Sequence, residues 1–343
     1  MKQKLSLYLI LLSCVLLLTS FAALFIGVYK FEHSSLETMR LLLTDASQIN
    51  ATDTYVFKQL RLPRIIMAIL IGSGLAVSGT CLQGMFKNPL ASPDLIGITS
   101  GAVLFAAVTI VLGSYLKQIL PEILHYSLLS FMSFVGSMLT MSFVYKMSST
   151  NGKTNVVILL LSGVAITALT GAATGLLTYL STEEELRNLT FWTLGSLAGA
   201  NWTKVLILAV VTLGSLALLI TKGKALNAMM LGEKDAEHLG INVEAMKKRI
   251  VLFAALMVGT AVAFAGTIGF VGLIVPYILR LLFKSNYYLI LPLSAISGSI
   301  LLLIADTISR TLVAPSELPI GILTAIMGAP VFIAILIRFK KSL

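Results

Sequence analysis

Long apolar stretches separated by short polar ones run along the whole chain. About 20 consecutive apolar residues cross a bilayer as an α-helix, and windows of that length predict about ten spanning helices. The predicted helices cover residues 5–29, 62–84, 97–116, 121–145, 155–180, 203–221, 250–270, 272–284, 288–307 and 319–338. The eighth is short and contains Pro276, so the backbone between 250 and 284 must break where protein or a wet cavity surrounds it.

Composition agrees with this pattern. Of 343 residues, 57% belong to the set AVILMFWYC and 12% are charged, against roughly 25% charged in a typical soluble domain. This balance excludes a soluble enzyme, a disordered chain and a disulfide scaffold. The apolar run from Leu5 to Tyr29 is longer than the about 7–15 residues of a signal-peptide core, so we expect a retained first span. The sequence therefore predicts an all-α, polytopic membrane protein with one transmembrane domain over residues 1–343.

Charge predicts how the helices are oriented. With both termini placed in the cytoplasm, the 25 Lys and Arg residues divide into sixteen inside and nine outside, which is the asymmetry of the positive-inside rule. Ten of the 15 acidic residues fall outside. The net charge of +10 is then cytoplasmic loop charge, and a nucleic-acid partner is not expected.

The segment 222–249 is predicted as a cytoplasmic loop of short amphipathic helices. Glycines interrupt it at Gly232 and Gly240. An apolar face alternates with acidic positions, and it consists of Leu231, Ala236, Leu239 and Ile241.

The sequence lacks residues that would let the chain drive transport with its own energy source. Ionisable residues are nearly absent from the predicted spans, which argues against a proton- or sodium-driven carrier. Asp306 and Arg310 are spaced as a local ion pair near an outer end. Gly152-Lys153-Thr154 lacks the first glycine of a phosphate-binding loop, because Met147 stands there. Since the chain has neither an ion relay nor a phosphate-binding loop, we expect a partner to supply the energy. No cofactor, disulfide or metal site is predicted.

Four ordered segments resemble the FecCD family, the permease subunits of ATP-binding-cassette (ABC) importers for iron–siderophores, haem and vitamin B12. They are Arg61-Leu-Pro-Arg64 with Gly72-Ser-Gly-Leu-Ala-Val-Ser-Gly79; Gln83 through Asn88-Pro89-Leu90 to Gly97; Leu231 to Gly240 with Gly266 to Pro276; and Ala305-Asp306, Arg310, Glu317 to Gly321 and Gly328-Ala-Pro330. Tyr277 departs from the family, in which many members have histidine after the proline.

The resemblance implies a type II importer permease with about ten helices in the cytoplasmic membrane. It implies a second permease subunit, identical or different, two cytoplasmic ATPase subunits and an extracytoplasmic substrate-binding protein. The chain itself is then not an enzyme.

The resemblance also implies roles for particular residues. The residues implied in docking the binding protein are Arg61, Arg64 and Arg310, because the planar guanidinium group binds carboxylates well. The alternative is that these arginines anchor the helix at the membrane interface.

The residues implied in coupling to the ATPase are Gly232, Glu233, Ala236, Leu239 and Gly240. The alternative is that this segment is a helix lying on the lipid surface.

The residues implied in a cytoplasmic gate are Asn88, Pro89, Leu90, Ser148, Ser149 and Thr150. The alternative is that they form plain connecting turns.

The leading functional prediction is translocation of an iron(III)–siderophore. Haem and cobalamin remain alternative substrates, because the chain has no sharp substrate code. An ion-gradient-driven transporter and a membrane scaffold without transport are the alternatives from other classes.

Overall fold

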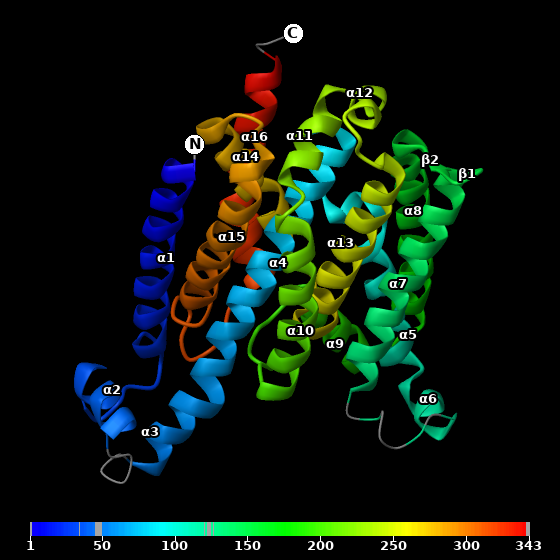
Figure 1. Cartoon of the computed structure of the whole chain (residues 1–343). Coiled ribbons are helices and arrows are strands. Elements are labelled where there is room, and N and C mark those ends of the chain that lie inside the picture. Colours follow the sequence, from blue (N-terminus) through cyan, green and yellow to red (C-terminus); the bar gives the residue numbers. More distant parts are fainter. Residues whose placement is uncertain are drawn as a thin grey trace.

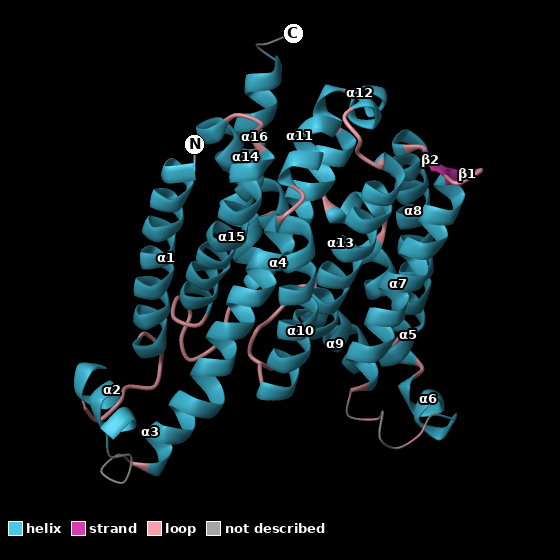
Figure 2. Cartoon of the chain, viewed as in Figure 1, coloured by secondary structure: helices cyan, strands magenta, loops and turns pink. Residues whose placement is uncertain are grey.

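The structure is a computed structural model that describes residues 2–33, 35–44, 50–119, 121, 125 and 127–340. Most of the described residues are helical, and a single hairpin of two short strands, each of two residues, is the β structure described (Figure 2). The elements are α1 Lys2–Phe25, α2 Ser35–Thr44, α3 Ala51–Tyr55, a π-helix Val56–Arg61, α4 Leu62–Phe86, a 3₁₀ helix Pro93–Ile96, α5 Ile98–Val111, α6 Gly113–Ile119, α7 Leu128–Ser148, β1 Ser149–Thr150, β2 Lys153–Thr154, α8 Val156–Leu180, α9 Glu183–Thr193, α10 Trp202–Ile220, α11 Gly223–Leu231, α12 Glu233–His238, α13 Val243–Ala265, α14 Val271–Phe283, α15 Tyr287–Ser309 and α16 Ile320–Lys340.

Within the described residues, eight helices are long and apolar enough to cross a membrane, and α5 and α14 are shorter apolar helices. The prediction of about ten spans is confirmed. The segment expected at 121–145 becomes helical at Leu128; positions 122–124 and 126 lie outside the described residues. Asparagine caps set several starts, for example Asn155, whose side chain accepts from Val157 N and Ile158 N.

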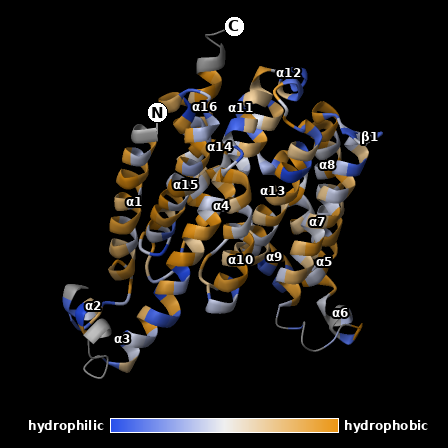
Figure 3. Cartoon of the chain, in the orientation of Figure 1, coloured by the Kyte–Doolittle hydropathy of each residue, from blue (hydrophilic) through white to orange (hydrophobic). Residues whose placement is uncertain are grey.

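The long helices form one bundle with α4 at its centre (Figure 1). About 89% of the apolar window of α4 is buried, against 11% for α1 and 22% for α8. Helices α10, α13, α14 and α15 pack around α4. Hydrophobic residues cover the length of the spans, whereas hydrophilic ones gather at the two ends (Figure 3).

The two ends of the bundle differ, and we name them by a helix. The α12 end carries the start of α1, the end of α16, α12 and the β1–β2 hairpin; the α2 end carries α2, α3 and α6 (Figure 1). The predicted loop 222–249 lies at the α12 end as α11, α12 and the first turns of α13. Helix α13 begins seven residues before the predicted start at 250, after Asn242, whose side chain accepts from Ala245 N and caps the first turn.

The predicted break between two spans is present. Helix α13 ends at Gly266, where φ is +70°, and α14 begins at Val271 after Phe270 with φ +67°. Protein groups satisfy this irregular stretch: Thr267 Oγ1 donates to Thr193 O at 2.5 Å, and Ser196 N donates to Ala265 O at 2.8 Å. Backbone of this kind is tolerated at membrane depth only when protein or water surrounds it.

Glycine allows close packing between some helices, whereas other helical glycines have no neighbour in the described part of the chain. Gly72 lies directly against Gly298, and Gly79 directly against Gly272. Gly171 and Gly175, which are four positions apart on α8, would each place a Cβ atom in open space. Among the residues that the structure describes, none therefore packs against this face of α8 at Gly171 and Gly175.

Candidate functional site

Arg64 forms buried ion pairs near the start of α4. Its Nε donates to Asp306 Oδ1 and Oδ2 at 2.9 and 3.0 Å, and its Nη2 donates to Oδ1 at 2.8 Å. Its Nη1 donates to Glu317 Oε1 at 2.7 Å. Asp306 is fully buried, so the pair joins α4 to α15 internally. The expected Asp306–Arg310 pair is also present, but its closest atoms are 3.9 Å apart.

Arg61 and Arg310 hold the end of α1. Arg61 Nη1 donates to Leu24 O at 2.6 Å and its Nη2 to Tyr29 O. Arg310 Nη2 donates to Ala23 O. Carbonyls in the last turn of a helix have no partner within the helix, and cationic donors there also offset the negative end of the helix dipole.

These three arginines line one hollow of about 380 Å³ at the α2 end, together with Glu317. The structure thus brings the predicted docking residues together. Each is less than a tenth exposed and has partners within the chain, although Arg310 Nε has no hydrogen-bond partner among the residues that the structure describes. Sequence alone missed the pairing of Arg64 with Asp306 and Glu317, although both acids stand in the segments that carry the family resemblance. Direct docking by the arginines stays a prediction.

The predicted gate residues form two separate turns at the α12 end. Asn88 follows the end of α4, and its Oδ1 accepts from Leu90 N at 2.9 Å. Arg280 Nη2 donates to Pro89 O at 3.4 Å. Ser148 ends α7 and is buried, and Ser149 and Thr150 form β1 of the hairpin, paired with Thr154 and Lys153. No hydrogen bond or ion pair joins the two turns in the part of the chain that the structure describes.

The segment Gly152-Lys153-Thr154 belongs to the hairpin between α7 and α8. Asn151 and Gly152 both have positive φ, +53° and +76°, as two-residue hairpin turns require. Gly152 and Lys153 therefore serve a tight turn between β1 and β2.

The predicted coupling segment is a short helix between glycines. Gly240, with φ +80°, ends α12: Gly240 N donates to Glu237 O at 2.9 Å and Ile241 N to Ala236 O at 3.0 Å, which is the Schellman pattern. Ala236 is fully buried, whereas Leu231 and Leu239 are 70% and 63% exposed. The expected apolar face is thus divided: Ala236 packs into the core, and the two leucines point away from the protein.

Lys247 connects three elements at the α12 end. Its Nζ donates to Glu233 Oε2 of α12 at 2.8 Å, to Glu244 Oε1 at 2.9 Å and to Thr154 O of the hairpin at 2.9 Å. Glu244 Oε2 in turn accepts from Thr154 N at 2.8 Å. The ammonium group therefore joins the predicted coupling helix to the predicted gate hairpin.

Comparison with known proteins identifies the family. The model of the FecCD transport family matches residues 15–338. The chain belongs to the FecCD transport family.

Relatives of this FecCD permease span nearly its full length. It is 41% identical over 288 residues to the hemin transport system permease protein of Yersinia pestis, covering 84% of this chain and 85% of that protein. It is 34% identical over 332 residues to the molybdate import system permease protein of Haemophilus influenzae, covering 96% and 95%. A solved structure described as an inward-facing conformation of a putative metal-chelate type ABC transporter matches 96% of this chain and 98% of its own, with 32% identity and a TM-score of 0.82.

The chain is thus a multi-pass permease of the ABC importer class, and the resemblance drawn from its motifs is confirmed. The similarity over 96% of the chain also confirms the all-α fold. Substitutions at individual residues of this FecCD permease would test the roles predicted for them.

Replacing Lys247 with methionine is expected to destabilise the α12 end of the permease. Removing one partner of a buried ion pair costs about 3–5 kcal/mol; we expect less here, because the Glu233 and Glu244 side chains are 43% and 28% exposed and recover water. Hydrogen exchange should accelerate in both α12 and the hairpin. Lys248→Met removes the same charge from the next, exposed position and should leave exchange unchanged. Equal exchange in both variants would mean that Lys247 does not join these elements.

Proposed function

We propose that this permease translocates an iron(III)–siderophore across the cytoplasmic membrane, driven by two ATPase subunits on its cytoplasmic face. A second permease subunit completes the passage, and an extracytoplasmic binding protein delivers the chelate. ATP hydrolysis belongs to the ATPase subunits.

The observation that carries this proposal is the similarity to the metal-chelate type transporter, which extends over 96% of the chain at 32% identity. The internal chemistry agrees with an intact chelate as cargo. Among the described residues, no group of three or more His, Cys, Asp or Glu side chains could take over the metal. We propose that the iron keeps its siderophore ligands during passage.

Haem is the second candidate substrate, because a relative that is 41% identical is a hemin transport permease; cobalamin is the third. Proteoliposomes that contain the permease, its ATPase and its binding protein separate these candidates. ATP-dependent accumulation of iron-labelled siderophore above that of haem and cobalamin supports the proposal. Accumulation of haem or cobalamin alone would replace the substrate and keep the importer function.

We propose that the α12 end is cytoplasmic. The start of α1 and the end of α16 share that end with α12 (Figure 1). With that end inside, the division of basic residues into sixteen inner and nine outer ones follows the positive-inside rule. The two gate turns, 88–90 and 148–150, then face the cytoplasm, and the hollow lined by Arg61, Arg64 and Arg310 faces the binding protein. An acidic side chain of that protein would enter the hollow and accept from Arg310.

We propose that the second permease subunit packs against α8. Only 22% of its apolar window is buried, and the face with Gly171 and Gly175 is open. Small residues four apart let membrane helices approach closely. Whether the partner is a second copy or a different permease leaves this placement unchanged.

Leu239→Arg should uncouple the permease from its ATPase. Leu239 is 63% exposed at the end of α12, so the substitution leaves the permease fold intact. In an ATPase groove the arginine would be a buried, unpaired charge, which costs several kcal/mol and weakens association by about two decades or more at about 1.4 kcal/mol per decade.

Co-purification of the ATPase and transport-coupled hydrolysis are the measurements, and Leu239→Met, which keeps an apolar side chain, is the matched control. Normal co-purification and transport by the arginine variant would show that this segment lies on lipid instead.

A further inference from the structure

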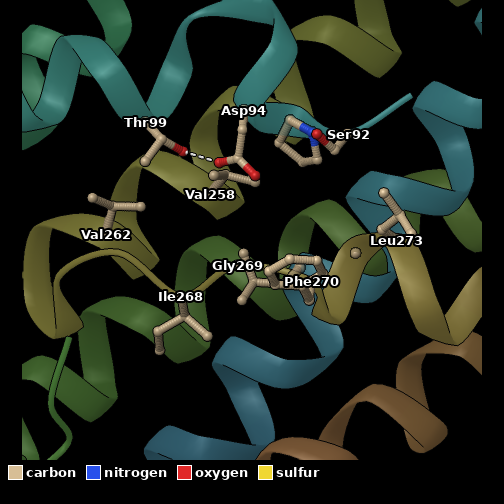
Figure 4. A pocket seen from close by; sticks show the side chains of 12 residues that line it. Ser92, Asp94, Thr99, Val258, Val262, Ile268, Gly269, Phe270 and Leu273 are labelled. Atoms are coloured by element: carbon tan, nitrogen blue, oxygen red, sulfur yellow. Dashed lines mark hydrogen bonds between the residues drawn. The ribbon is translucent and has the colours of Figure 1, made fainter. Parts of the chain in front are cut away.

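The chain after the Asn88–Leu90 turn folds back into the bundle and carries an acidic residue with it. The 3₁₀ helix Pro93–Ile96 lies directly against α8: a Cβ atom on Gly163 would lie 2.3 Å from Leu95 O. Asp94 consequently lines a cavity with Leu75, which is midway along α4, and with Val258 and Val262 of α13 (Figure 4). The sequence placed this residue in a cytoplasmic loop, because local hydropathy does not reveal a segment that re-enters.

Asp94 is exposed to this cavity. Thr99 Oγ1 donates to Asp94 Oδ1 at 2.6 Å (Figure 4). Asp94 is exposed, although the cavity that it lines reaches Leu75, midway along α4. An ionisable side chain at membrane depth is costly, and such residues usually face a water-filled passage and mark a functional site.

Hydroxyl-bearing residues line the two cavities that Asp94 borders. The cavity of about 200 Å³ seen in Figure 4 shares Asp94, Thr99, Ile268 and Gly269 with a second cavity of about 440 Å³ beside α8. The second cavity adds hydroxyls from three elements, namely those of Ser100, Thr167, Thr174 and Thr267. It also reaches Gly171, on the open face of α8 where we place the second subunit.

The charge of Asp94 is not balanced locally. Among the described residues that line these two cavities, no lysine, arginine or histidine accompanies it. A carboxylate in this position attracts cationic and hydrogen-bond-donating groups and repels anions.

We infer that Asp94 and the surrounding hydroxyls form a charge-selective contact for the passing substrate, which favours cationic and neutral chelates and disfavours anionic ones. This inference rests on the proposed function as a chelate importer. It narrows the substrate class towards hydroxamate-type iron chelates, which are neutral or carry an ammonium group, and away from tricatecholate chelates, which are strongly anionic.

The test measures uptake of three iron-labelled chelates into proteoliposomes that contain the full complex: a cationic trihydroxamate, a neutral trihydroxamate and an anionic tricatecholate. The wild-type complex should prefer the cationic over the anionic chelate. Asp94→Asn should reduce that ratio by at least tenfold, because the lost attraction for one unit positive charge about 10 Å away, at an effective dielectric constant of about 20, alone accounts for about tenfold, and the lost repulsion of the anionic chelate adds to it. Asp94→Glu should keep the ratio.

Two further variants separate charge from structure. Thr174→Lys places a positive charge in the same cavity without removing the Thr99–Asp94 hydrogen bond, so it should shift the ratio in the same direction as Asp94→Asn. Glu183→Gln removes an equal charge from exposed α9 and should leave the ratio unchanged.

The outcomes are distinct. An unchanged ratio in both cavity variants, or an equal loss for all three chelates, would overturn the assignment of Asp94 and keep the importer function. Absence of ATP-dependent uptake of every chelate by the wild-type complex would overturn the proposed function and, with it, this inference.

Discussion

Arg64→Met is expected to destabilise the permease by about 3–5 kcal/mol, the cost of removing one partner of a buried ion pair. The substitution leaves Asp306, which is fully buried, without the guanidinium that donates three hydrogen bonds to it. Arg310 offsets this loss only in part, because its Nε lies 3.9 Å from Asp306 Oδ2, within ion-pair distance but beyond hydrogen-bond distance. Thermal unfolding of the purified permease in detergent is the measurement.

The double variant Arg64→Met with Asp306→Asn provides the control. It removes the buried charge as well as its partner, so it should recover much of the lost stability; replacing a buried ion pair as a whole is often nearly neutral. The same samples test docking. If Arg64→Met is as stable as the wild type but binds its binding protein weakly, Arg64 acts at the docking surface and the internal pair contributes little.

Gly79→Ala is expected to separate α4 from α14. A Cβ atom on Gly79 would lie 1.8 Å from Gly272 O and 2.5 Å from its carbonyl carbon, and backbone cannot turn aside as a flexible side chain can. The separation would also break the bond that Gln83 Nε2 donates to Gly272 O at 3.3 Å. Overpacking typically costs about 1–3 kcal/mol, occasionally more, and this contact lies at the centre of the bundle.

Gly214→Ala is the matched control for this contact. A Cβ atom on Gly214, within α10, meets nothing within 4 Å. Alanine is also favoured over glycine in a helix by about 0.8–1.0 kcal/mol, so this variant should be neutral or slightly more stable. The measurements for both variants are the yield of monodisperse permease and its melting temperature. Equal values for both variants would show that α4 and α14 can move apart freely.

The spans were predictable because the bilayer restricts the backbone. Each apolar segment must satisfy its own hydrogen bonds in lipid and therefore becomes a helix. The predictions 62–84, 155–180 and 203–221 correspond to α4 at 62–86, α8 at 156–180 and α10 at 202–220. Larger errors occur where polar side chains continue a helix, as at the start of α13, where Lys247 and its neighbours suggested a loop.

The ordered motifs placed the chain in its family, because each motif is local in sequence. The partners of their residues were not predictable in the same way. The sequence predicted an ion pair between Asp306 and Arg310, which are four positions apart. The main partner of Asp306 is instead Arg64, which is 242 positions away. It suggested one apolar face for 231–241, whereas packing against the bundle buries Ala236 and leaves Leu231 and Leu239 exposed.

By itself the sequence determined the all-α membrane fold, the number of spans and the FecCD family, because hydropathy and short motifs act over distances of one helix. Only the tertiary structure decided which charges are buried together and which face a cavity. Arg64 joins α4 to α15, Lys247 joins α12 to the hairpin, and Asp94 lines a cavity inside the bundle. Each of these placements depends on the approach of segments far apart in the chain. The free energy of a buried charge is set by the groups around it in space, and local sequence does not contain that information.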